Sequence, residues 1–373
     1  MRIILQAQRF GSLAIGLLLW SGMIARGEEP AERYTGPWNV RALKQTPKAT
    51  WGKATALVRE VIYEGGPFDG NPTRVFAYYA RPKTGDGPFP AMLLVHGGGG
   101  KAFKEWATLW ADRGYVALAM DLSGRGPDGN RLTDGGPEQD DVHKFRDFKE
   151  NEVGRMWTYH AVAAVLRGYS LLADRKEVDR DRIGVTGISW GGYLTCIIAG
   201  IDDRVKVAVP VYGCGFLGDN SAWLGQFGKM TPEQRTLWLS LFDPSVYLKG
   251  VTCPILFVNG TNDFAYPLDS YQKSYHLVPE PLRTLRVTVA MPHGHPQGWA
   301  PIEIGLFVDS VLKQGAPLLK AGPLIVANGR ATAEVKGSKP IQTAQGHVTT
   351  DDGPWQTRHW RDLKATVDGR TIG

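Results

Sequence analysis

The feature that most constrains the fold is the stretch Gly-Ile-Ser-Trp-Gly-Gly at residues 187–192. A short apolar run at 182–186 precedes it, and a helix-compatible segment at 192–199 follows it. This order predicts a strand, a sharp turn and a helix, with G-x-S-x-G at the corner. Glycines on both sides let the backbone turn without a Cβ clash and place the serine hydroxyl at the tip. The pattern therefore indicates Ser189 as a candidate nucleophile.

Apolar and β-branched runs alternate with helical patterns along the rest of the chain. We expect strands at residues 57–63, 74–80, 91–95, 115–120, 182–186, 206–211, 254–258 and 285–290. Helices are expected at 103–112, 155–173, 192–199, 268–277 and 302–312. The later strands are short and continuously apolar, as strands covered by helices on both faces must be. The sequence thus predicts an α/β fold with a mostly parallel sheet of about eight strands.

The N-terminal residues have the three parts of an export signal. Arg2 and Arg9 supply a positive region, residues 13–20 supply an apolar core, and residues 25–27 supply small residues before a cleavage point. The apolar run is short for a membrane span. We therefore expect residues 1–27 to be a signal peptide and the protein to be secreted or periplasmic.

The sequence pattern of the remaining chain changes near residue 315. Residues 28–315 are expected to form the catalytic α/β domain, with long insertions at 123–152 and 213–244 that lack clear periodicity. Residues 316–373 are predicted to form a small β-rich segment, since short alternating runs appear at 324–327, 331–335 and 363–367. Such a segment either packs on the main domain or is an incomplete β-sandwich. We favour the second, because residues 368–370 resemble a hairpin turn with no returning strand.

A serine nucleophile needs an acid that orients its base. Asp263 comes directly after the apolar strand predicted at 254–258. It therefore lies at the strand end toward which the serine turn also opens. The alternative role for Asp263 is to cap the helix that follows residues 266–267.

The base is expected in the loop after the last strand, at residues 290–296, which contains two histidines. We favour His295, because it follows a glycine and lies three residues past Pro292. That spacing gives the loop room to swing back over Ser189. His293 follows the strand so closely that its ring is expected to point elsewhere.

A glycine-rich stretch follows another buried strand. Residues 92–95 are apolar and lead into His-Gly-Gly-Gly at 96–99, whose backbone N–H groups can face a tetrahedral intermediate. The second donor would be the N–H of Trp190, the residue after the nucleophile. A phosphate-binding loop would need G-K-S/T, whereas Lys101 is followed by Ala102, so nucleotide binding is not expected.

Composition excludes several other classes of protein. The net charge is +6 without a run of five basic residues, so we expect no nucleic-acid partner. A single His-x-His pair without a third ligand and the absence of C-x-x-C argue against a metal, and no cofactor is expected. The three cysteines are expected to be buried free thiols, Cys196, Cys214 and Cys253.

Four stretches together resemble the α/β-hydrolase superfamily and, within it, the acetyl xylan esterase, dienelactone-hydrolase-like and prolyl-oligopeptidase-like group. These are residues 94–99, 181–192, 259–263 and 293–295, and the resemblance covers about residues 56–313. The resemblance implies that Ser189, Asp263 and His295 are nucleophile, acid and base. It also implies that Gly98 and Trp190 supply the oxyanion donors. Dienelactone hydrolases use a cysteine nucleophile, so the serine here argues against that activity.

Three functions are compared. The leading hypothesis is an exported serine carboxylesterase that works through an acyl-enzyme and removes short acyl groups, in particular acetyl, from carbohydrate esters. The second is a peptidase or amidase, which would need acidic residues to hold a peptide amino terminus. Glu150 and Glu152 are the nearest candidates, and a helix-start role is their alternative. The third is a non-catalytic binding protein. For the esterase we expect an ester substrate and no membrane partner beyond the export signal.

Overall fold

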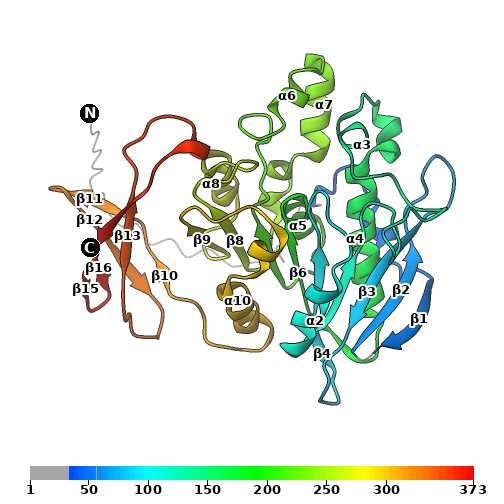
Figure 1. Ribbon diagram of the computed structural model, residues 1–373, viewed down its shortest axis with the longest axis horizontal. Coiled ribbons are helices and arrows are strands. Elements are labelled where there is room, and N and C mark those ends of the chain that lie inside the picture. Colours follow the sequence, from blue (N-terminus) through cyan, green and yellow to red (C-terminus); the bar gives the residue numbers. More distant parts are fainter. Residues whose placement is uncertain (1–32, 56) are drawn as a thin grey trace, which may run out of the picture. The chain divides into compact units, whose positions relative to one another are not determined.

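A nine-stranded sheet forms the centre of the computed structural model, which describes residues 33–55 and 57–373 (Figure 1). The predicted signal peptide lies outside the described residues. Across the sheet the order is β1 (Ala49–Thr55), β2 (Val58–Glu64), β3 (Arg74–Ala80), β5 (Val116–Met120), β4 (Phe89–Val95), β6 (Val178–Ile188), β7 (Val207–Val211), β8 (Ile255–Gly260) and β9 (Arg283–Thr288). Strands β1 to β3 and the β3–β5 pair are antiparallel, and all neighbours from β5 to β9 are parallel. The predicted mostly parallel sheet is confirmed.

Burial follows the position of each strand in the sheet. Every residue of β5, β7 and β8 is buried, as expected for central parallel strands rich in valine, leucine and isoleucine. The edge strands are different. β1 was not predicted, because it has no run of apolar residues; most of its residues are exposed. β9 leaves Leu285 and Val287 exposed by 47% and 38% on one face.

Helices cover both faces of the sheet. α4 (Trp157–Ala173) and α5 (Trp190–Ile201) pack together, while α2 (Lys104–Asp112) and α10 (Ile302–Leu312) share a second side. Gly187 lies against α5, whereas its neighbour Thr186 lines a hollow beside α2 and α10. Because successive strand residues point to opposite faces, the two helix pairs cover opposite sides. The five helix predictions are confirmed, including α8 (Leu268–Leu277).

The two predicted insertions contain short helices that the sequence analysis did not anticipate. Residues 123–152 include α3 (Asp141–Phe145) and the start of η1 (Glu150–Arg155). Residues 213–244 include α6 (Leu224–Phe227) and α7 (Pro232–Phe242), which Thr231 caps by accepting from the Gln234 N–H. The remaining short helices are α1 (Val40–Leu43), η2 (Pro244–Val246), η3 (Leu248–Gly250) and α9 (His295–Trp299).

The C-terminal segment forms two small antiparallel sheets within the compact unit of residues 34–373. One contains β10 (Lys320–Ala321), β11 (Ile325–Ala327), β12 (Arg330–Lys336), β15 (Val367–Asp368) and β16 (Thr371–Ile372). The other pairs β13 (Gln345–Val348) with β14 (Arg361–Lys364), and η4 (Trp355–Thr357) lies between them in sequence. One expectation is corrected here: the turn at 368–370 has a returning strand, since β16 pairs with β15. No helix in residues 33–55 and 57–373 has the length and apolar character needed to cross a membrane.

Candidate active site

Ser189 occupies the turn between β6 and α5, with φ +59° and ψ −117°. A positive φ is strained for a residue that carries a Cβ. Close packing holds this backbone in place: a Cβ on Gly187 would lie 2.1 Å from the Gly191 carbonyl oxygen, and a Cβ on Gly191 would lie 1.9 Å from that of Val95. The Ser189 N–H donates to the Val211 carbonyl at 2.9 Å. The predicted strand, turn and helix are confirmed, and the serine stands at the corner.

Asp263 follows β8 and contacts His293, which follows β9. The buried Asp263 carboxylate accepts from the N–H groups of Ala265 at 3.0 Å and Tyr266 at 2.7 Å. Its other oxygen lies 2.6 Å from Nδ1 of His293. An ionised carboxylate can only accept, so Nδ1 is the donor in this contact, which leaves Nε2 as an acceptor whenever the ring is neutral. The pair has the arrangement of an orienting acid and its base.

The expectation that His295 pairs with Asp263 is wrong. His295 begins α9, and its Nε2 accepts a hydrogen bond from the Gly97 N–H at 2.9 Å. Its ring packs 4.7 Å from that of Phe103. Burial, together with His96 and His293, lowers the pKa of His295 to about 4, so its ring stays neutral and able to accept above that pH.

The reason is the sharp turn that the chain makes after β9. Ala290 has φ +50°, and its N–H donates to the Thr261 hydroxyl at 3.0 Å. The Met291 N–H donates back to Thr288 at 3.4 Å. With the direction reversed so early, His293 already reaches the acid, and the extra length before His295 carries that residue past it.

Tyr212 links the serine turn to the histidine. It directly follows Val211, whose carbonyl accepts from Ser189. The Tyr212 ring stacks on His293 at 4.3 Å, and its hydroxyl donates to the Pro292 carbonyl at 2.7 Å. Tyr212 also has a positive φ of +64°. Tyr212 was not predicted as a site residue from the sequence, although a tyrosine at the end of a parallel strand faces the same edge as the nucleophile.

Two backbone N–H groups are available near Ser189. The N–H of Gly97 is occupied by His295, whereas that of exposed Gly98 has no acceptor among the described residues. Trp190 is the first residue of α5, so its N–H has no partner within the helix. A Cβ on Gly98 would lie 3.2 Å from Cδ1 of Trp190, which shows how closely the two residues approach. The structure brings the two predicted oxyanion residues together.

His96 anchors the start of the glycine-rich loop. Its Nε2 accepts from the Leu122 N–H at 2.8 Å, and its Nδ1 lies 2.7 Å from the Gly97 carbonyl oxygen. Burial lowers the pKa of His96, which favours the neutral ring that this pair of contacts requires. The loop is therefore held by two neutral histidines, His96 and His295.

A buried lysine lies beside Trp190, the residue after Ser189. Lys144 of α3 places its Nζ 4.9 Å from the ring centre of Trp190 and 5.8 Å from that of Trp157. Burial lowers the pKa of Lys144, and Asp141 opposes that shift. Cation–π contacts of this kind stabilise a desolvated ammonium group. The long predicted loop thus contributes a residue that supports the oxyanion side of the site.

Possible metal ligands and thiols were located in the described part of the chain. Across residues 33–55 and 57–373, no three His, Cys, Asp or Glu side chains gather in a way that could hold a metal ion. All three cysteines are buried. Burial raises the pKa of the Cys196 and Cys214 thiols, which makes them poor nucleophiles.

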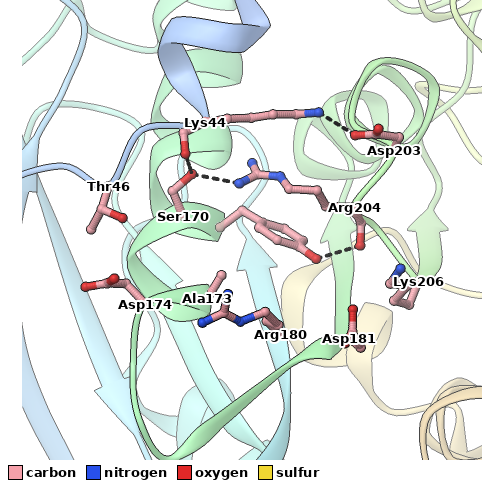
Figure 2. A pocket seen from close by; sticks show the side chains of 11 residues that line it. Lys44, Thr46, Ser170, Ala173, Asp174, Arg180, Asp181, Asp203, Arg204 and Lys206 are labelled. Atoms are coloured by element: carbon pink, nitrogen blue, oxygen red, sulfur yellow. Dashed lines mark hydrogen bonds and ion pairs between the residues drawn. The ribbon is translucent and has the colours of Figure 1, made fainter.

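A polar hollow of about 450 Å³ lies at the opposite end of the sheet, by the amino ends of β6 and β7 (Figure 2). Two of its cations are paired within the protein: Lys44 pairs with Asp203, and Arg204 donates to Asp202 at 2.7 Å and to Ser170 at 3.0 Å. Ser189 lies at the carboxyl end of β6. The hollow is therefore not part of the candidate active site.

The strand order and the covering helices define the class of fold: the chain has the α/β-hydrolase fold. In sequence and in fold it is similar to acetyl xylan esterases and to dienelactone-hydrolase-like and prolyl-peptidase-like enzymes. Residues 45–223, slightly less than half of the chain, match the acetyl xylan esterase (AXE1) family model.

Individual relatives agree with this placement. The acetyl esterase Axe7A of Xylanibacter ruminicola is 24% identical over 229 residues, covering 57% of this chain and 51% of the relative. The acetyl xylan esterase structure from Paenibacillus sp. R4 superposes with a TM-score of 0.58 at 23% identity, covering 74% of this chain and 92% of the other. The Pyrococcus horikoshii acylaminoacyl peptidase gives 0.51 at 20% identity, covering 74% and 44%. The chain spans about half the length of the curated relatives it matches.

Proposed function

We propose that this protein is an exported serine carboxylesterase that removes acetyl groups from carbohydrate esters. Ser189 is the nucleophile, His293 the base and Asp263 the orienting acid. The observation that carries the proposal is the 2.6 Å contact between His293 and Asp263, on the sheet edge where the strained serine turn opens. The base is thus His293 and not the histidine favoured from sequence.

In the proposed acylation step, Ser189 Oγ attacks the carbonyl carbon of the ester and its proton passes to Nε2 of His293. The oxyanion that forms accepts hydrogen bonds from the N–H groups of Gly98 and Trp190. Each such donor typically contributes about 3–4 kcal/mol of transition-state stabilisation. The bond to the alcohol oxygen then breaks, and that oxygen takes the proton from His293. The acyl group remains on Ser189 as an ester.

In the deacylation step, a water molecule attacks the acyl-enzyme and gives its proton to His293. The same two N–H groups bind the second oxyanion. The bond to Ser189 Oγ then breaks, the serine regains its proton from His293, and the carboxylic acid leaves. The buried Asp263 carboxylate stabilises the imidazolium in both steps and keeps Nδ1 as the protonated nitrogen.

The substrate class is proposed from the similar proteins. The matching family model and the Paenibacillus structure carry the name acetyl xylan esterase, and Axe7A is named an acetyl esterase. These names support a short acyl group and a sugar alcohol. Export, proposed from residues 1–27, is consistent with a polymeric substrate outside the cell. Sequencing the N-terminus of secreted protein tests this, and a mature chain that begins near residue 28 is expected.

The test of the proposed reaction is ester hydrolysis by the wild type and by Ser189→Ala. Release of p-nitrophenol from acetyl, butyryl and longer esters measures chain-length preference, and acetate release from acetylated xylo-oligosaccharides measures the proposed substrate. Serine-dependent turnover that is fastest on acetyl esters is expected. Turnover that persists in the Ser189→Ala variant would contradict the mechanism.

A peptidase is the second candidate, favoured by the fold it shares with the acylaminoacyl peptidase. The acidic residues considered for anchoring a peptide do not support it. Glu152 accepts from the Lys149 N–H at 3.0 Å and so caps η1, which is the helix-start role considered from sequence. Serine-dependent cleavage of aminoacyl p-nitroanilides, without ester turnover, would favour the peptidase. A folded protein that cleaves neither substrate would favour a non-catalytic binding role.

A further inference from the structure

A second hollow, of about 700 Å³, lies between the edge of the main sheet and the C-terminal segment. Its walls come from α8, from β9, and from residues 319–324 together with Trp355 and Trp360. This volume falls within the range of about 300–1,000 Å³ that is typical of small-molecule sites. None of the proposed triad residues lines it, so it is separate from the candidate active site.

Hydrogen bonds from the α/β domain fix the C-terminal wall of this hollow. The side-chain amide of Asn262 donates to the carbonyls of Trp355, Gln356 and Arg358, the last at 2.7 Å. Asn262 directly precedes Asp263. The loop that carries the proposed catalytic acid therefore anchors this wall.

A second tie holds the other end of the wall. Lys320 donates to the carbonyl of Arg283 at 2.7 Å and to that of Glu280 at 3.3 Å. These two residues stand at the start of β9 and just before it. The α/β domain therefore fixes the C-terminal wall of the hollow at two separate points.

The lining combines flat aromatic rings with neutral hydrogen-bonding groups. Trp355, Trp360 and Tyr275 line the hollow, and exposed Gln272 offers an amide that both donates and accepts. The Nε1 of Trp360 is buried and has no hydrogen-bond partner among the described residues. A buried donor without a partner is costly.

Lys320, Glu280 and Arg283, which line the hollow, already have partners within the protein. Lys320 lies 3.6 Å from the Glu280 carboxylate. Arg283 donates to the carbonyls of His276 and Val278, each at 3.1 Å, and its guanidinium lies 4.7 Å from the ring centre of Tyr275. No carboxylate pairs with Arg283 among the described residues, but these carbonyl oxygens and the Tyr275 ring already hold its guanidinium. A neutral ligand fits better.

We propose that this hollow binds a neutral pyranose oligosaccharide and holds the polymer whose acetyl groups are removed at Ser189. A pyranose ring has a face of C–H groups that packs on an aromatic ring, and hydroxyls around its edge that need donors and acceptors. Trp360 supplies such a ring, whereas Arg358 and Arg283 already cover one face of Trp355 and of Tyr275. Gln272 supplies a donor and an acceptor. This inference rests on the proposed function, which it deepens by adding a second contact with the sugar chain.

Binding of unacetylated xylohexaose to the full chain tests the proposal. Titration calorimetry on Ser189→Ala measures affinity without turnover, and Trp360→Ala and Gln272→Ala are added in that background. We expect Trp360→Ala to weaken binding by on the order of ten-fold, as for other aromatic anchors, and Gln272→Ala to weaken it less. Trp51→Ala is the matched control, because Trp51 is a half-buried tryptophan on β1, the opposite edge strand. It should bind as tightly as the parent.

Kinetics separate this proposal from the proposed function. With Ser189 intact, the Trp360→Ala and Gln272→Ala variants should hydrolyse p-nitrophenyl acetate normally, which also shows that they fold, and should have a raised KM on acetylated xylan. Normal ester turnover without xylohexaose binding, or equal binding by all variants, overturns the hollow as a sugar site and leaves the esterase intact. Xylohexaose binding that depends on Trp360 without any ester turnover overturns the esterase alone.

Discussion

Replacing each of the two histidines of the 293–295 loop by alanine, one at a time, is the sharpest test of the proposed site. His293→Ala removes the ring whose Nδ1 lies 2.6 Å from Asp263. Loss of the histidine from a serine triad lowers kcat by roughly 10⁴- to 10⁶-fold, or about 5–8 kcal/mol. His295→Ala removes the acceptor of the Gly97 N–H and the ring that packs on Phe103.

An unsatisfied buried N–H costs about 1–3 kcal/mol. If this whole cost raised the free energy of the transition state, kcat would drop by at most about 150-fold. His295→Gln should recover part of the loss, because its side-chain oxygen can accept from Gly97. The two alanine variants should therefore differ by about fifty-fold or more in kcat.

The assay is kcat and KM on p-nitrophenyl acetate, with circular dichroism to confirm that each variant folds. Added imidazole should restore some activity to His293→Ala, because it can occupy the space left by the ring. A larger loss in His295→Ala than in His293→Ala would refute the assignment of the base. So would a His293→Ala variant that keeps a tenth of the wild-type kcat.

Three further predictions follow from individual contacts. The folded-state pKa of His295 is about 4, below the ordinary histidine value of about 6.5. Between these two pH values the unfolded chain therefore binds more protons than the folded chain. The free energy of unfolding should fall as the pH drops through that window. His295→Gln should reduce this slope in urea melts, and an unchanged slope would contradict the attribution. Gly191→Ala should destabilise the fold by about 3 kcal/mol or more, whereas Gly225→Ala, in a helix with no atom within 4 Å of its added Cβ, should be neutral or slightly stabilising; similar melting temperatures for both would refute the packing argument. Tyr212→Phe loses the hydrogen bond to Pro292 and should lower stability by about 1 kcal/mol and kcat several-fold with little change in KM, and wild-type kinetics would show that the hydroxyl does not position the loop.

Local sequence rules predicted the parts of the fold that depend on short-range chemistry. Continuous apolar runs gave the central strands, and glycines at 187 and 191 gave the serine turn, because each reflects burial or sterics within a few residues. The edge strand β1 was missed, since it has no run of apolar residues and most of its residues are exposed. The helix α7 had a readable start in Thr231 followed by Pro232, a common cap and first-turn pair that the analysis did not use.

The choice between the two histidines could not be made from the loop sequence. It depends on the positive φ at Ala290 and on the hydrogen bond from that residue to Thr261, which lies 29 positions earlier in the chain. Such a contact leaves no trace in the spacing of Pro292, His293 and His295. The tie between Asn262 and the C-terminal segment is equally non-local.

The left-handed backbone at Ser189 places activity and stability in opposition at one residue. Glycine adopts φ +59° without strain, so Ser189→Gly should raise the free energy of unfolding by about 1 kcal/mol while it removes the attacking hydroxyl. A higher melting temperature in this variant than in Ser189→Ala would measure the strain directly, and equal values would argue against it. A lineage selected for heat resistance alone would therefore be expected to lose its nucleophile at this position.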